Sequence, residues 1–102
     1  MALVIYTKRA FSDFERIFDF LAKADTTLAS TAVSVISEAV SILEHHPLIG
    51  RLVEHGLREL VIARGKAGYV ALYRYVEKRD VILVLALRHQ REGSYTRETL
   101  SE

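Results

Sequence analysis

The sequence predicts an α+β domain: a leading strand, an antiparallel helical hairpin and a three-stranded antiparallel meander, with the helices packed on one face of a small sheet. Aliphatic, β-branched and aromatic residues fill the first few positions, apolar residues then recur at three- and four-residue intervals, and short strand-like apolar segments follow in the second half. The later apolar segments are joined by short polar connections, which favour antiparallel hairpins. With 102 residues, the chain has the length of one domain, so we expect 1–102 to form a single unit.

The first half begins with a strand and continues with two helices. Leu3 to Thr7 combines aliphatic, β-branched and aromatic residues, which is typical of a strand. The following helix is indicated by apolar residues at helical spacing, namely Phe11, Phe14, Ile17, Phe18 and Leu21. Ser12 or Asp13 is a candidate cap for its start. A break near residues 25–27 offers a new cap, and a second helix continues to about Glu44.

The second helix has two apolar lines, which allow two interpretations. One line contains Leu28, Ala32, Val35, Ile36, Ala39 and Leu43, and the other contains Ala29, Val33 and Val40. Close packing against the first helix in a hairpin accounts for both lines. The alternative is a partly exposed apolar face that a protein partner covers.

The second half predicts a loop and three strands. Pro47 and Gly50 place a loop over residues 45–51. Strands are expected over residues 57–63, 69–76 and 81–88, and the polar tail from Ser94 is expected to form at most a helical turn. A hairpin of helices then covers one face of the sheet, and the other face is left as a partly covered, concave surface.

Composition limits the functional classes. The net charge of +1 is the sum of −2 over residues 1–50 and +3 over residues 51–102, a weaker basic bias than proteins held by phosphate contacts alone usually show. Without cysteine there is no disulfide or thiolate metal site. The longest strongly apolar run, Val81 to Leu87, is too short to span a bilayer, and the N-terminus lacks the pattern of a signal peptide. We therefore expect a cytoplasmic protein without a membrane contact.

Strand alternation places Tyr69, Tyr73 and Tyr75 on one face of the second strand of the meander. Such a row is either the half-buried edge of a core or a stacking platform for bases. Arg74 lies on the other face among apolar residues, and Glu59 on the neighbouring strand is a candidate partner for it.

The end of the last strand carries the strongest candidate for chemistry. Arg88, His89 and Arg91 lie close together in the sequence, and Tyr95 follows. Cleavage of RNA needs a base, an acid and positive charge near the phosphate, and an imidazole titrates near neutral pH. His89, Tyr95 and Arg91 are therefore candidate catalytic residues, with phosphate-binding candidates at Arg51, Arg58 and Arg88. The alternative is that these charges are simply solvated at the end of a strand.

Other catalytic classes are not indicated. His45, His46 and His55 lack further ligands at metal-site spacing, so we expect no metal and no cofactor. The sequence contains no glycine loop that cradles phosphate and no nucleophile elbow, which argues against nucleotide hydrolases and serine hydrolases.

The order of these fragments resembles the RelE/ParE superfamily of toxins from bacterial type II toxin–antitoxin modules. The resemblance covers nearly the whole chain, through the leading strand, the helical hairpin and the fragments Pro47-Leu48-Ile49-Gly50-Arg51, Leu57-Arg58-Glu59-Leu60, Gly68-Tyr69, Tyr73-Arg74 and Arg88-His89-Gln90-Arg91-Glu92. It implies a small cytoplasmic toxin neutralised by a cognate antitoxin whose C-terminal segment wraps around it.

The resemblance leaves two mechanisms open. RelE-like members are ribosome-dependent endoribonucleases that cleave mRNA, and this mechanism would use Arg51, Arg58, Arg64, His89, Arg91 and Tyr95 here. ParE-like members inhibit DNA gyrase and are not enzymes. Val70 stands where ribonuclease members often have arginine, and the net charge is low, so the sequence favours gyrase over ribosome and mRNA as the target. A third alternative is an interaction module without toxicity.

Overall fold

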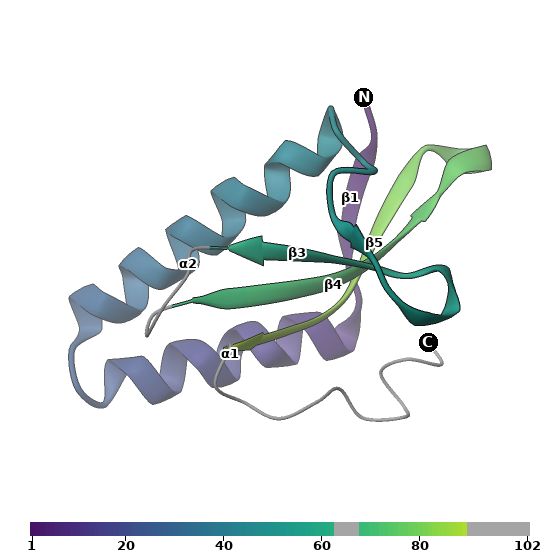
Figure 1. Cartoon of the computed structure of the whole chain (residues 1–102). Coiled ribbons are helices and arrows are strands. Elements are labelled where there is room, and N and C mark those ends of the chain that lie inside the picture. Colours follow the sequence, from purple (N-terminus) through teal and green to yellow (C-terminus); the bar gives the residue numbers. More distant parts are fainter. Residues whose placement is uncertain (63–67, 90–102) are drawn as a thin grey trace.

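The computed structural model of the chain describes residues 1–62 and 68–89. The described elements are β1 (Leu3–Tyr6), α1 (Lys8–Ala22), α2 (Thr26–Ser41), the 3-10 turn η1 (Ile42–Glu44), β2 (Arg51–Leu52), the 3-10 turn η2 (Glu54–Gly56), β3 (Arg58–Ile62), β4 (Tyr69–Val76), the 3-10 turn η4 (Glu77–Arg79) and β5 (Val81–His89). Figure 1 shows the two helices as an antiparallel pair beside the sheet. The predicted α+β order is confirmed.

The strands form one mixed sheet of five strands in the order β1-β5-β4-β3-β2. The pairs β3–β4 and β4–β5 are antiparallel, which confirms the predicted meander. β1 joins the far edge and runs parallel to β5, with Leu3 opposite Val81 and Tyr6 opposite Val84. At the other edge, the predicted loop ends in the two-residue strand β2, which pairs with Arg58 and Glu59.

The start of α1 differs from the prediction. The cap is Thr7, whose hydroxyl oxygen accepts the N–H of Ala10 at 3.2 Å and whose hydroxyl donates to the Val84 carbonyl at 3.0 Å. The predicted caps Ser12 and Asp13 lie inside the helix instead. Thr7 can do this because it directly follows β1 and touches β5, a contact that sequence spacing does not reveal. The predicted start of α2 is confirmed, since Asp25 caps it by accepting the N–H of Thr27 at 2.9 Å.

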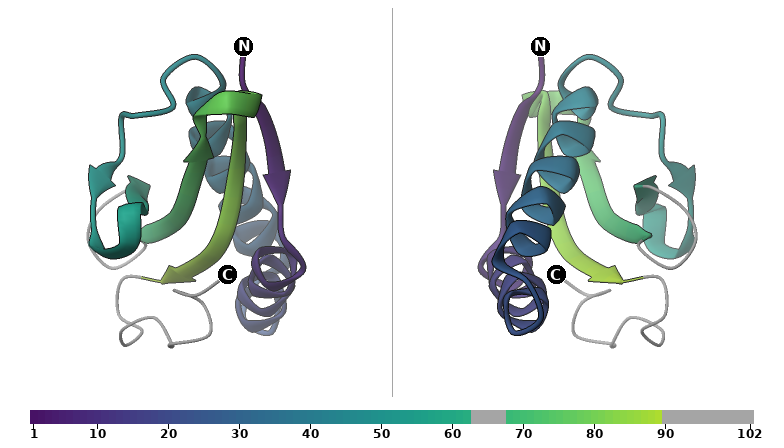
Figure 2. Two further views of the ribbon diagram at one scale, coloured as in Figure 1. Left: turned by 90° about the vertical axis from the view of Figure 1, so that its right-hand side faces the viewer. Right: turned by 90° about the vertical axis from the view of Figure 1, so that its left-hand side faces the viewer.

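The sheet has a different cover on each face (Figure 2). On the helix face, buried residues of α1 and α2, such as Ile17 and Ile36, pack with Tyr73, Ile82 and Leu87. On the opposite face, a smaller buried cluster contains Leu57, Leu72, Leu85 and Ala86, with Val53 and Leu83 packed against it. The segment after β2 thus covers part of the face that the sequence left open, so the concave free surface is smaller than predicted.

The helical region Thr26–Glu44 is long and apolar enough, by length and composition alone, to cross a membrane. A core helix of a soluble protein has the same properties. Here Ala29, Ala32, Ile36 and Val40 are buried, and the exposed positions include Ser30, Ser34, Ser37 and Ser41. This distribution is that of a helix packed on a sheet.

The tyrosine row of β4 is part of the core. Tyr69 and Tyr73 are buried, and Tyr75 packs against the same cluster on the helix face. The interpretation as a core edge is therefore confirmed, and these rings are not available as a stacking platform. The predicted pairing of Arg74 with Glu59 is wrong, because the Glu59 carboxylate contacts Arg51 and Arg88 instead.

Candidate functional site

A buried carboxylate from α1 holds the end of β5 in place. Asp13 is only 6% exposed, and its Oδ2 accepts the backbone N–H of Leu87 at 2.9 Å. Its Oδ1 lies 3.4 Å from Arg9 Nε and 3.6 Å from Arg16 Nη2, and Arg16 also donates to the Leu87 carbonyl at 3.4 Å. Leu87 directly precedes the candidate residues Arg88 and His89, so α1 sets the position of both.

Arg88 and His89 project to opposite faces of the sheet. His89 pairs with Tyr69 across the strands, and their rings meet edge to face at 5.5 Å, on the side where the helices pack. Arg88 reaches the carboxylate of Glu59, and its Nη2 lies 3.9 Å from Oε2. Consecutive residues of a strand necessarily diverge in this way. The two side chains therefore do not converge on one reacting group.

Glu59 joins two of the predicted phosphate-binding arginines. It lies on β3 with 8% exposure, and its Oε1 accepts a hydrogen bond from Nη2 of the exposed Arg51, while Oε2 faces Arg88. We call Arg51, Glu59 and Arg88 the Glu59 cluster. One carboxylate offsets one of two guanidinium charges, so the cluster carries a net charge of about +1 rather than the concentrated positive charge that a phosphate transition state requires.

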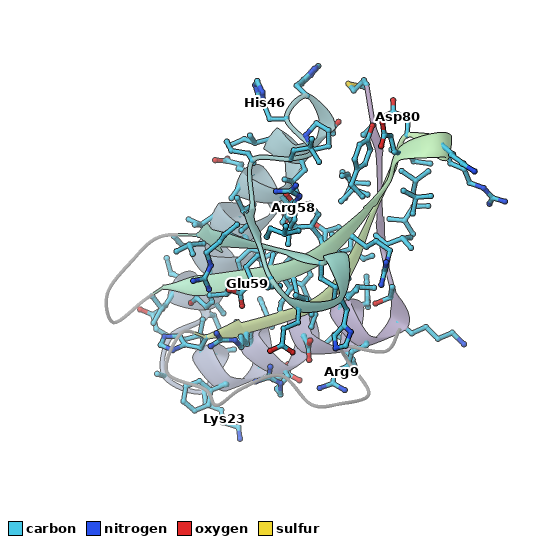
Figure 3. All side chains as sticks on the ribbon, turned by 45° about the vertical axis from the view of Figure 1, so that its right-hand side comes forward. Arg9, Lys23, His46, Arg58, Glu59 and Asp80 are labelled. Carbon is cyan, nitrogen blue, oxygen red and sulfur yellow. The ribbon has the colours of Figure 1, made fainter. Side chains whose placement is uncertain are left out.

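Arg58 does not contact Glu59 in this way but binds backbone carbonyl groups of the preceding loop. Its Nη1 donates to the backbone carbonyl groups of Leu48 at 3.2 Å and of Gly50 at 2.9 Å. In Figure 3, Arg58 and Glu59 are labelled on neighbouring positions of the sheet. The guanidinium of Arg58 thus organises the loop between η1 and β2, which we call the Pro47–Arg51 turn.

Tyr73 holds the same turn from the core side. The N–H of Gly50 donates to the Tyr73 hydroxyl oxygen at 2.9 Å, and that hydroxyl donates to the Pro47 carbonyl at 2.8 Å. Residue 50 must be glycine. A Cβ there would lie 2.6 Å from a ring carbon of Tyr73, 2.6 Å from the Tyr73 hydroxyl oxygen and 2.8 Å from the carbonyl oxygen of Glu59. Glycine is therefore required because the Tyr73 side chain and the backbone of Glu59 leave no room for a larger residue.

Removing the Tyr73 hydroxyl should weaken the fold and change its response to alkali. Burial raises the pKa of Tyr73 above its ordinary value of 10.0, although the hydrogen bond from Gly50 and the charge of Arg58 act in the opposite direction. A raised folded-state pKa means that the hydroxyl stabilises the fold fully below about pH 10 and that this contribution is lost as the pH rises through the folded-state pKa. We expect Tyr73→Phe to lower the free energy of unfolding by about 1–3 kcal/mol at neutral pH and to reduce the loss of stability above pH 10.

Urea denaturation at a series of pH values measures both effects. Tyr75→Phe is the matched control, because it removes a hydroxyl from the same strand whose hydrogen bond to Asp80 is exposed. The control should change stability less than Tyr73→Phe does. Equal losses in the two variants would contradict the role assigned to Tyr73.

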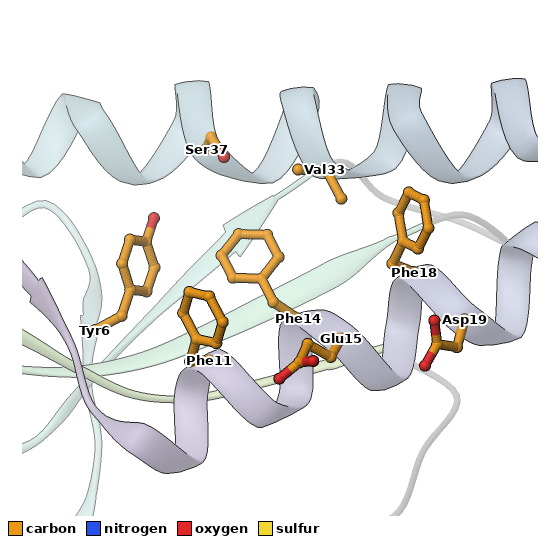
Figure 4. A pocket seen from close by; sticks show the side chains of 8 residues that line it. All are labelled: Tyr6, Phe11, Phe14, Glu15, Phe18, Asp19, Val33 and Ser37. Carbon is orange, nitrogen blue, oxygen red and sulfur yellow. The ribbon is translucent and has the colours of Figure 1, made fainter.

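A second candidate surface lies between α1 and α2 and has a volume of about 450 Å³. Figure 4 shows phenylalanine rings of α1 directed toward α2, with Tyr6 at one end and Val33 opposite. We call this the aromatic groove, and it is lined by Tyr6, Phe11, Phe14, Glu15, Phe18, Asp19, Val33 and Ser37. Phe11 and Phe18 are exposed, while Phe14 stacks edge to face on Tyr6 at 5.4 Å. The hairpin interpretation of the second helix holds, and an apolar surface also remains.

The structure therefore brings together part of the predicted site. Arg51 and Arg88 meet at Glu59, Arg58 binds the Pro47–Arg51 turn, and His89 lies on the other face. Arg64, Arg91 and Tyr95 lie outside the described residues, so their predicted roles stay predictions.

Three roles were not predicted from the sequence: Asp13 as the acceptor for the Leu87 amide, Glu59 as the acceptor for Arg51 and Arg88, and the Tyr73 hydroxyl as a partner of Pro47 and Gly50. The sequence did contain a signal for two of these residues. Asp13 lies on the apolar side of the first predicted helix, and Glu59 lies among the apolar residues of a predicted strand. Such a residue is rarely buried without a partner.

The known proteins to which this chain is similar include toxins and toxin–antitoxin systems. The family described as the ParE toxin of the type II toxin–antitoxin system parDE matches residues 4–93. Toxin RelE3 of Caulobacter vibrioides is 29% identical over 84 residues, which are 82% of this chain and 89% of that protein. A structure of the chromosomal ParDE toxin–antitoxin system from P. aeruginosa has a TM-score of 0.73 at 27% identity and covers 87% of this chain and 96% of its own. The RelBE2 toxin–antitoxin complex from Mycobacterium tuberculosis shares the fold, with a TM-score of 0.60 at 20% identity, covering 87% of this chain and 98% of its own.

Proposed function

The chain belongs to the ParE toxin family of type II toxin–antitoxin systems, and from this premise we propose that it arrests growth by binding DNA gyrase and does not cleave mRNA. The membership rests on the match over residues 4–93. The mechanism is a separate matter, because similar proteins carry both ParE and RelE names. The proposal includes action in the cytoplasm.

The observation that carries the proposal concerns the predicted phosphate-binding arginines within residues 1–62 and 68–89: Arg51, Arg58 and Arg88 each contact a group of the fold itself. A ribonuclease needs positive charge free to meet the phosphate and a general acid or base directed at the same atom. Here Glu59 contacts Arg51 and Arg88, and Arg58 binds carbonyl groups of the Pro47–Arg51 turn. His89 is on the opposite face from Arg88. This arrangement favours contacts with a protein over cleavage of RNA.

Paired assays with the purified protein test the mechanism. We expect it to inhibit supercoiling by gyrase and to leave mRNA on translating ribosomes intact. Supercoiling that persists at saturating toxin would end the gyrase proposal. Cleavage of mRNA that is lost in His89→Ala would support the ribonuclease alternative, and absence of growth arrest on induction would support the interaction module without toxicity.

We also propose that a cognate antitoxin covers the aromatic groove. The structures similar to this chain are toxin–antitoxin systems. The groove offers exposed Phe11 and Phe18 to an apolar segment, and Glu15 and Asp19 on its lining favour a lysine or arginine beside that segment. Replacement of Phe11 by serine should therefore weaken antitoxin binding, which titration calorimetry measures.

A further inference from the structure

The Pro47–Arg51 turn exposes two large aliphatic side chains side by side in the sequence. Leu48 is 57% exposed and Ile49 is 58% exposed, and Leu52, in the strand that follows, is also exposed. Single exposed aliphatic residues are ordinary on protein surfaces. Neighbouring ones that form a patch are typical of contact surfaces.

The backbone of this turn is held far more firmly than a solvent loop requires. Four hydrogen bonds join this backbone to side chains: Arg58 donates to the carbonyl groups of Leu48 and Gly50, Tyr73 donates to the Pro47 carbonyl, and the Gly50 N–H donates to the Tyr73 hydroxyl oxygen. Gly50 packs directly against Tyr73. Core and strand side chains thus fix the backbone, while Leu48 and Ile49 do not pack into the core. A loop fixed in advance loses little conformational entropy when a partner binds it.

The charges around the turn restrict the kind of partner. Residues 45–51 contain His45, His46 and Arg51 and no carboxylate. Arg51, the last residue of the turn, is exposed and also belongs to the Glu59 cluster. The aromatic groove, in contrast, is lined by Glu15 and Asp19. The two apolar surfaces therefore differ in charge and suit different occupants.

We infer that the Pro47–Arg51 turn anchors the toxin to its protein target. Leu48 and Ile49 enter an apolar pocket of that target. Glu59 contacts only Nη2 of Arg51, and the exposed remainder of this guanidinium meets a carboxylate at the rim of the pocket. This inference rests on the proposed function insofar as the target is a protein. It assigns the antitoxin to a different surface, so toxicity and neutralisation depend on separate residues.

The test uses the full chain with Leu48 and Ile49 both replaced by serine. The matched control replaces Leu28 and Val35 by serine, because these are also exposed aliphatic residues and lie on α2. Each protein is examined for growth arrest on induction, for the concentration that half-inhibits gyrase, and for affinity toward the antitoxin encoded beside it. Thermal denaturation establishes that both variants are folded.

The turn variant should need at least tenfold more protein for inhibition and should no longer arrest growth, with antitoxin affinity changed less than twofold. The control should behave as the parent chain. The inference is overturned if the turn variant still arrests growth, if the control loses activity equally, or if the turn variant loses antitoxin affinity while inhibition persists. If the parent chain arrests growth without inhibiting gyrase and the turn variant does not arrest growth, the gyrase proposal fails and the anchoring role stands.

Discussion

Replacing Asp13 by alanine is expected to lower the free energy of unfolding by about 3 kcal/mol. The carboxylate is buried and accepts the N–H of Leu87, and it also contacts Arg9 and Arg16. A hydrogen bond to a charged group contributes more than a neutral one, and its removal leaves the backbone amide of β5 without its acceptor inside the fold. The loss should be large because α1 and β5 are both anchored at this point.

Chemical denaturation measures the change in stability, and hydrogen exchange of the Leu87 amide reports it locally. The matched control is Asp19→Ala, which removes an exposed carboxylate from the same helix. The control should change stability little, and exchange at Leu87 should accelerate only in Asp13→Ala. A loss below about 1 kcal/mol for Asp13→Ala would show that the contact is not an anchor.

Replacing Glu59 by glutamine should increase the affinity for polyanions about tenfold at low salt. The change preserves the shape of the side chain and one of its two acceptor oxygens, and it removes the negative charge between Arg51 and Arg88. A unit charge about 6 Å from a phosphate, at an effective dielectric constant of about 40, contributes about 1.4 kcal/mol. If Glu59 is what makes this surface unsuitable for RNA, its neutralisation should expose that latent affinity.

Glu54→Gln is the control for Glu59→Gln, because the total charge changes equally while the Glu54 side chain is 80% exposed. Binding to poly(U) or heparin is measured at increasing ionic strength. We expect the Glu59 variant to gain affinity at low salt and to lose the gain at high salt, and the Glu54 variant to change less than twofold. Equal gains would show that only net charge matters and that Glu59 has no special role.

The Glu59→Gln and Glu54→Gln variants also test whether charge alone distinguishes a gyrase inhibitor from a ribonuclease. A carboxylate among arginines reduces their attraction to phosphate chains and leaves directional contacts suited to a protein surface. A Glu59→Gln chain that bound RNA and still did not cleave mRNA would show that charge alone does not produce a nuclease. We expect that outcome because Arg88 and His89 lie on opposite faces of the sheet.

The fold was predictable because local patterns and short connections agree. The strand at the N-terminus was indicated by its residue types, the two helices and the three strands of the meander were indicated by their apolar patterns, and the cap of α2 was expected near residues 25–27. The start of α1 was not, since Thr7 acts as the cap partly through its hydrogen bond to Val84, which is distant in the sequence. The parallel pairing of β1 with β5 likewise depends on which sheet edge is left free.

For the candidate site, the sequence predicted which residues take part but not which groups they contact. The arginines at positions 51, 58 and 88 were identified from the sequence, but their partners were not. Whether a guanidinium meets a phosphate, a carboxylate or a backbone carbonyl depends on a few ångströms of side-chain placement, and here Glu59 and the Pro47–Arg51 turn determine it. A charge count cannot distinguish these cases, because the same residues carry the same charge in each.

The sequence by itself determined the element order, the faces of β4 and membership of a recognisable superfamily, because these follow from periodicity and from fragments contiguous in the chain. The tertiary structure alone decided that β5 continues through His89, that Glu59 engages two arginines, and that Tyr73 and Arg58 fix the turn bearing Leu48 and Ile49. These contacts join residues that are distant in the sequence, and their strength depends on burial and separation, which only the folded chain defines.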